Sequence, residues 1–180
     1  MASHPKVSFS GSELRSNDIG QHHQNTASAI NLYFSSGNPK AKILFAGMTH
    51  LELQNQLDGV SEENEQLIAM SLLSSLEAAF RVDYLQRCYK KKKDALSRAF
   101  RQIHHHKGTK ASLEDDIFDT WKAHSNVPNQ LVSDLKSAFK YRHWLAHGRY
   151  WSPKLGRKYD YFSIYTLAQK IESGFPFEGR

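Results

Sequence analysis

The residues best suited to chemistry in this chain are Arg142 and His147, within the aromatic and basic segment Phe139–Trp151. A guanidinium group neutralises phosphate oxygens and donates paired hydrogen bonds to them. An imidazole takes up and releases protons near neutral pH. Together these two side chains could act on a phosphodiester. Gly148 follows directly, as glycine often does where a helix ends.

A helix with an apolar stripe is expected to position this pair. Asn126-Val-Pro128 is typical of a helix start, because proline is favoured in the first helical turn. Apolar residues then recur at helical spacing, with Leu145 on a flank: Leu131, Leu135, Ala138, Phe139 and Ala146. Arg142 lies on or beside this stripe, so its charge needs a partner that offsets desolvation. Glu77 would supply a carboxylate; otherwise the partner is a phosphate or an open cleft.

His147 is too far round the same helix to meet Arg142 directly. Five residues correspond to about 140° and about 7.5 Å in an ideal helix, so the two side chains diverge. They could converge if the helix unwinds at Gly148. They could also converge if a second copy brings its own pair opposite, in a symmetric homodimer with the site on its two-fold axis.

The spacing alone is a weak pattern, since Arg101 and His106 show it too. The context favours Arg142 and His147, because an amphipathic helix precedes them and aromatic residues flank them. Trp151 and its aromatic neighbours could stack on bases, although packing is the more common role for such residues.

Four or five helices are expected in residues 61–180. Ser61-Glu62-Glu63 is typical of a helix N-terminus. The apolar spacing that follows indicates an amphipathic helix over 62–88, and leaves open its continuation through 90–106 after a bend. Caps and stop signals delimit the other helices: Gly108, Ser112, Asp160, Gly174 and Pro176. The sequence therefore predicts an all-α helical bundle.

Residues 1–60 form a separate N-terminal extension in this interpretation. Residues 1–24 are polar and are expected to be loosely ordered. Apolar runs within 26–35 and 40–57 are split by Ser35–Pro39. They suit two helices or a hairpin of two short strands, with helices slightly favoured.

The charge pattern indicates a polyanionic partner, with RNA as the first candidate. The chain carries a formal net charge of +6, concentrated in residues 87–110 and 136–158. The expected contacts to the nucleic-acid backbone are Lys90, Lys91, Lys92, Lys93, Arg149 and Lys154. A solvated basic surface, or one that meets an acidic protein, is the alternative.

Several other classes of protein and site are disfavoured. No apolar run approaches the length of a membrane span, and the start of the sequence lacks the pattern of a signal peptide. The single cysteine, Cys88, fits a packing role in a reducing, cytoplasmic setting. His104–His106 point about 100° apart on a helix, so they suit a shared metal ion poorly. No metal and no cofactor are expected.

The segment Arg142-His-Trp-Leu-Ala-His147-Gly resembles the signature of the HEPN superfamily (higher eukaryotes and prokaryotes nucleotide-binding domains). In that signature an arginine and a polar residue are followed by a histidine near a helix end, and His143 fills the polar position. Leu73–Arg81, with Glu77, is similar to an earlier helix of the family. The resemblance covers roughly residues 60–173.

The resemblance implies an all-α bundle and a metal-independent endoribonuclease that dimerises to build its site. His147 would then act as general base or acid on the ribose 2′-OH or the leaving oxygen. Arg142 would stabilise the charge of the transition state, with His143 and Glu77 in support. Some toxins of the family carry a tyrosine two residues after the histidine, which a partner nucleotidyltransferase modifies. Tyr150, three residues after His147, is the nearest equivalent.

The resemblance also implies a context and an alternative. Many active members belong to toxin–antitoxin or anti-phage systems, so an antitoxin or another defence protein is an expected partner. Other members are inactive dimerisation or nucleic-acid-binding modules, in which case Arg142 would be paired with Glu77 and closed to solvent. A third hypothesis does not depend on the resemblance. It is an unrelated basic helical domain that binds nucleic acid through Lys90–Lys93.

Overall fold

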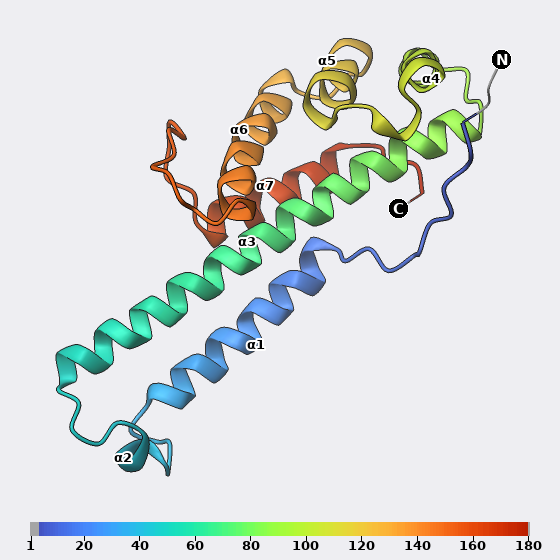
Figure 1. The fold of residues 1–180 in the computed structure, drawn as a ribbon. Coiled ribbons are helices and arrows are strands. Elements are labelled where there is room, and N and C mark those ends of the chain that lie inside the picture. Colours follow the sequence, from blue (N-terminus) through green and yellow to red (C-terminus); the bar gives the residue numbers. More distant parts are fainter. Residues whose placement is uncertain (1–3, 180) are drawn as a thin grey trace.

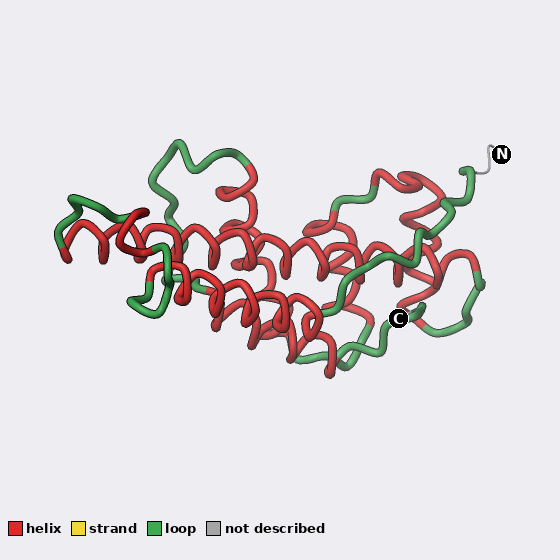
Figure 2. Tube along the Cα trace, turned by 90° about the horizontal axis from the view of Figure 1, so that it is seen from below, coloured by secondary structure: helices red, strands yellow, loops and turns green. Residues whose placement is uncertain are grey.

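A computed structural model describes residues 4–179 of the chain, and every regular element in that range is helical. Figures 1 and 2 show helices joined by loops, with no strand among the described residues. The predicted all-α class is therefore confirmed. A 3₁₀ turn, η1 (Gly108–Lys110), and a π-helical segment, η2 (Leu113–Phe118), accompany the α-helices: α1 (Ser16–Phe34), α2 (Ala41–Leu44), α3 (His50–Tyr89), α4 (Ala95–Lys107), α5 (Asp119–His124), α6 (Asn129–Ala146) and α7 (Tyr161–Gly174).

The longest element, α3, begins well before the predicted start at Ser61. Thr49 caps it by accepting a hydrogen bond from the backbone N–H of Glu52, whose carboxylate accepts one from the N–H of Thr49 in return. This reciprocal capping box satisfies two free donors at the true N-terminus. Ser61 lies inside the helix, so its assignment as a start was wrong. The expected boundary after residue 60 also falls within α3.

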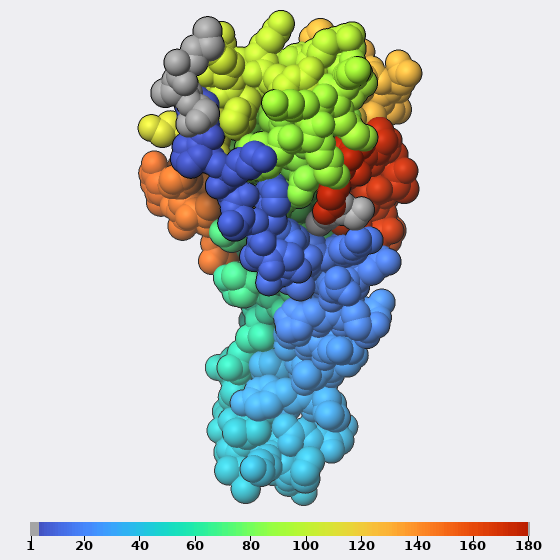
Figure 3. All heavy atoms as spheres, turned by 90° about the vertical axis from the view of Figure 1, so that its right-hand side faces the viewer, coloured from blue at the N-terminus to red at the C-terminus, as the bar shows by residue number. Residues whose placement is uncertain are grey.

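The N-terminal region is more ordered than the sequence suggested. Residues 16–24, expected to be loose, form the first half of α1, which packs along α3. The two helices and the short α2 make a hairpin whose distal end projects as a narrow column beyond the body of the molecule (Figures 1 and 3). The alternative of two short strands is wrong here, because residues 26–34 and 50–57 are helical.

The chain breaks between α3 and α4. Tyr89 ends α3, and Lys91 takes a left-handed backbone conformation with φ of 51°. Asp94 then caps α4 by accepting a hydrogen bond from the Ser97 N–H at 2.9 Å. Residues 90–106 are therefore not a continuation of the long helix but a turn and a separate helix that packs back on α3.

The core is built around aromatic side chains from three parts of the chain. Trp121 of α5 is fully buried, and its ring lies 6.2 Å from that of Phe80 on α3. Phe175 and Phe177, which follow α7, pack on both rings. Large rings bury much apolar area, so the C-terminal segment is part of the core.

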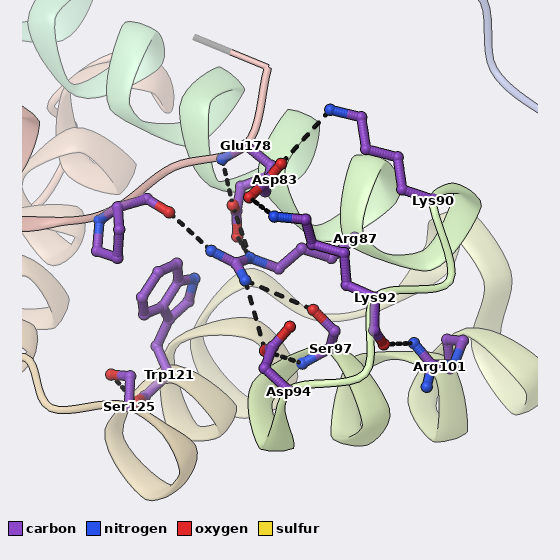
Figure 4. Close-up of polar contacts among 11 residues, drawn as sticks. Asp83, Arg87, Lys90, Lys92, Asp94, Ser97, Arg101, Trp121, Ser125 and Glu178 are labelled. Carbon is purple, nitrogen blue, oxygen red and sulfur yellow. Dashed lines mark hydrogen bonds and ion pairs between the residues drawn. The ribbon is translucent and has the colours of Figure 1, made fainter.

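A buried ion pair fixes the C-terminal segment to α3 (Figure 4). Arg87 Nε donates to the Asp83 carboxylate at 2.8 Å, and both side chains are almost fully buried. Arg87 also donates to the Pro176 carbonyl, and Asp83 accepts the Glu178 N–H, each at 2.7 Å. These additional hydrogen bonds offset part of the cost of burying two charges.

Helix α6 and the loop after it carry the residues of greatest interest. Leu135, Ala138 and Phe139 are buried as the stripe predicted. Ala146 is exposed instead, and Leu145 packs against the core. The loop ends at Asp160, which caps α7 as predicted by accepting the Ser163 N–H at 2.8 Å.

Candidate active site

Arg142 lies on α6 opposite Glu77 of α3, the carboxylate that was one of the partners left open by the sequence. Its Nη2 is 3.0 Å from the Glu77 Oε2, and about a third of its side chain is exposed. The same carboxylate holds Arg81, whose Nε donates to Oε1 at 2.8 Å. Glu77 therefore lies between two guanidinium groups and balances only part of their charge.

Arg142 is paired in charge, but its Nε–H donor has no acceptor in the described part of the chain. Its contact with Glu77 is an ion pair, and its Nε is buried with no hydrogen-bond partner among residues 4–179. A guanidinium carries five N–H donors in a planar fork. The Nε is closed to solvent, so an incoming oxyanion could reach only the terminal Nη groups, in the exposed third of the side chain.

A groove of about 430 Å³ opens beside this guanidinium. It is lined by α3, α6 and the start of η2: Glu77, Arg81, Ser112, Leu113, Glu114, Asp115, Phe139, Arg142 and His143. Three carboxylates and two guanidinium groups make it mixed in charge. Binding of a phosphate there would depend on Arg142 and Arg81, because the groove as a whole is not strongly basic.

The histidine that lines this groove is His143, and His147 lies one turn further on. His147 caps the end of α6, and its N–H bonds to the His143 carbonyl at 3.1 Å. The two imidazole rings are 4.2 Å apart between centroids. Within one chain, His143 lines the groove with Arg142, and His147 is next to His143. The side chains of Arg142 and His147 were expected to diverge, and this arrangement agrees with that expectation.

The chain reverses direction immediately after His147. Gly148 has φ of 75° and Arg149 has φ of 59°, a left-handed conformation that glycine adopts readily and arginine rarely. Arg149 reaches α3, where it bonds to Glu63 at 2.7 Å and also to Gln66. The side chain expected to contact nucleic acid is thus engaged in holding the loop.

The aromatic residues of the loop are arranged around a backbone contact. Trp144 Nε1 donates to the Trp151 carbonyl at 2.7 Å, which fixes Trp151 beside the end of α6. The Trp151 ring lies 5.9 Å from that of His143 and 4.6 Å from that of Tyr150. Tyr150 is 84% exposed, so its hydroxyl is open to modification or to a partner.

A second pocket of about 400 Å³ adjoins the groove, and Glu114 and His143 line both. Its other walls come from α6 and the loop: Lys140, Trp151, Pro153, Lys154 and Leu155. Lys154 was expected to contact nucleic acid. Glu114 was not singled out, because it lies 28 residues before Arg142 in a segment that resembled a helix cap.

The lysine block is remote from this site. Glu77 and Lys90 are 13 residues apart on one helix axis, which corresponds to about 20 Å. Lys90 and Lys92 pair with Glu178 of the C-terminal segment (Figure 4). Only Lys91 and Lys93 of the block are without an ion pair in the described part of the chain.

The described residues also bear on metals, thiol chemistry and membranes. No group of three or more His, Cys, Asp or Glu within 4–179 is arranged to hold a metal ion. Burial raises the pKa of the Cys88 thiol to about 12, which fits a packing residue rather than a nucleophile. In the same range no helix has the length and apolar character needed to span a bilayer.

Comparisons with protein-family models, with curated proteins and with solved structures return no match.

Proposed function

We propose that this protein is a metal-independent endoribonuclease of the HEPN type, acting as a homodimer. The observation that carries the proposal is the position of Arg142, which is paired in charge with Glu77 and yet remains about a third exposed in the lining of a groove. His143 lines the same groove, and the His147 ring lies 4.2 Å from the His143 ring. Phosphate binding and proton transfer could therefore occur within one small region.

The reaction that suits these groups is transesterification by the ribose 2′-OH. His147 removes the 2′ proton, the 2′-oxygen forms a bond to phosphorus, and the bond to the 5′-oxygen breaks. Arg142 stabilises the negative charge that develops on the phosphoryl oxygens. The leaving 5′-oxygen takes up a proton in turn, returned to it by the protonated His147. The products are a 2′,3′-cyclic phosphate and a 5′-hydroxyl, and the nucleophile belongs to the substrate.

The biological setting belongs to the same proposal. The resemblance described above suggests a toxin or defence effector restrained by an antitoxin or another partner. A reducing, cytoplasmic location stays a prediction.

One observation favours a second candidate, an inactive module that dimerises or binds nucleic acid. The ion pair between Arg142 and Glu77 is the contact expected for an arginine with a structural role. The two candidates differ in one property, because only the enzyme cleaves RNA.

The test is cleavage of total and transfer RNA in EDTA by wild type and by His147→Ala. His106→Ala is a matched control, because His106 is exposed and also follows an arginine by five residues. We expect wild type and His106→Ala to leave 2′,3′-cyclic phosphate ends, and His147→Ala to lose at least about 100-fold in rate. A folded dimer of wild type that leaves RNA intact would establish the inactive module instead.

A further inference from the structure

The pocket beside the groove has the shape and position of a base-binding subsite. Glu114 and His143 line both cavities, so a nucleotide chain with a phosphate at Arg142 continues directly into it. Its volume of about 400 Å³ can hold a nucleobase, and its walls come from three separate segments, α6, η2 and the loop.

One wall of this pocket is an aromatic surface held in place. The Trp151 carbonyl accepts the hydrogen bond from Trp144 Nε1, so the backbone beneath the Trp151 ring is fixed to α6. The His143 ring lies 5.9 Å away and inclined at 55°. Flat rings of this kind stack on unpaired bases and accept any of the four.

Discrimination between bases would come from Glu114. Its side chain is half-buried and makes no hydrogen bond or ion pair within residues 4–179, although Lys140 and Lys154 line the same pocket. An ionised carboxylate only accepts hydrogen bonds, and its two oxygens suit two adjacent donors. Glu114 therefore presents two acceptor oxygens that have no hydrogen-bond partner among residues 4–179.

Guanine alone among the four bases offers two adjacent donors on its Watson–Crick edge, the ring N1–H and the exocyclic amino group. Adenine and cytosine each place an amino group beside a ring nitrogen that accepts, and uracil has one N–H between two carbonyls. The lysine ammonium groups can in turn donate to the guanine O6 and N7 or to a phosphate.

We propose that this pocket is a guanine-selective subsite, in which Glu114 binds the Watson–Crick edge and Trp151 stacks on the base. As a part of RNA cleavage it rests on the proposed function, and it assigns the substrate as single-stranded RNA with guanosine next to the scissile phosphate. Guanine nucleotide binding itself does not require that the protein be an enzyme.

The first test measures binding without catalysis. GMP, AMP, CMP and UMP are titrated separately into His147→Ala, and the tryptophan indole signals are followed by NMR. We expect GMP to bind at least about tenfold more tightly than the others, and Glu114→Gln to remove that preference. Asp119→Asn is the matched control, since it removes the same charge from the adjacent helix and does not line the pocket.

The second test uses wild type and short RNAs that differ by a single guanosine. Cleavage next to guanosine by wild type, with Glu114→Gln losing that preference, supports the subsite. Cleavage of all sequences alike by wild type overturns the subsite and keeps the ribonuclease. Selective GMP binding without cleavage of any RNA keeps the subsite and rejects the ribonuclease. Equal or absent binding of all four nucleotides overturns the subsite.

Discussion

At the scale of single residues, Glu77 has the most consequential position, because its carboxylate serves both Arg81 and Arg142. In the ribonuclease it would orient Arg142 and also repel an incoming phosphate. These two effects act on different kinetic constants, since orientation matters in the transition state and repulsion already matters in the bound state.

Glu77→Gln should separate the two effects. We expect kcat to fall by about tenfold, because Arg142 loses the charge that holds it, while KM for RNA stays equal or decreases. Steady-state cleavage of a fluorescent RNA measures both constants. An increase in KM at unchanged kcat would contradict this role for Glu77.

Asp83 gives a second residue-scale prediction, on stability. Burial raises its pKa to about 6, although the Glu178 N–H and Arg87 oppose that shift. The folded protein therefore holds this proton at a pH where the unfolded chain, with a pKa near 4, has released it. The stabilisation is full below about pH 4 and is lost as pH rises through about 6.

The free energy of unfolding of wild type, minus that of Asp83→Asn, should therefore decrease by about 2 kcal/mol between pH 4 and pH 7. Urea unfolding at several pH values measures it. Asp160 supplies a comparison of opposite sign, because the Ser163 N–H lowers its pKa. The stabilisation from Asp160 should be present above about pH 4 and lost on further acidification. A pH-independent difference for Asp83→Asn would show that Asp83 does not titrate in this range.

Residue-level reasoning identified contacts between helices better than contacts involving loops. The apolar faces of two helices made Glu77 one of the candidate partners of Arg142, and the structure pairs them. The separation of His147 from Arg142 followed from helical geometry. Neither the Arg149–Glu63 pair nor the position of Glu114 could be anticipated. Both depend on the path of the loop after Gly148, which no periodic pattern specifies.

At the scale of elements, the ends of the helices are set mainly by side-chain caps. Ser112 and Asp160 were predicted as caps, and each accepts a backbone N–H three residues on. Ser61 was assigned wrongly because acidic residues follow it, as they would in a first turn. The apolar pattern of α3 continues upstream to the Thr49–Glu52 capping box, so no helix end is needed at Ser61.

Asp160→Ala should destabilise the protein by about 1 kcal/mol, the usual cost of losing an N-cap. Asp160→Ser, which keeps a side-chain acceptor at the cap, should recover most of that loss. Thermal unfolding of the two variants beside wild type is sufficient. Equal losses in both variants would mean that the charge of Asp160 and not its capping bond is what stabilises α7.

At the scale of the whole molecule, the proposed site is incomplete within one chain. Arg142 lines the groove and His147 does not. Two copies related by a two-fold axis would bring both arginines and both histidines together. The catalytic groups would then be shared between the copies.

Mixing two inactive variants tests this sharing. Arg142→Ala and His147→Ala, unfolded and refolded together, should regain measurable cleavage, because the mixed dimer keeps one arginine and one histidine at the shared site. Each variant refolded alone is the baseline, and sedimentation reports the dimer. Activity equal to the sum of the two baselines would place a complete site in each copy.

The length of α3 has a consequence for how chains of this kind can vary. Glu63 and Glu77 lie on the same uninterrupted helix, 14 residues and about 21 Å apart, and they hold Arg149 and Arg142 respectively. Inserting one residue between them would turn one anchor by about 100° relative to the other. Homologous chains should therefore show insertions and deletions in the loop over 152–158 and none between 63 and 77. The helix fixes both the distance and the relative direction of its two anchoring carboxylates, so its length between them cannot vary.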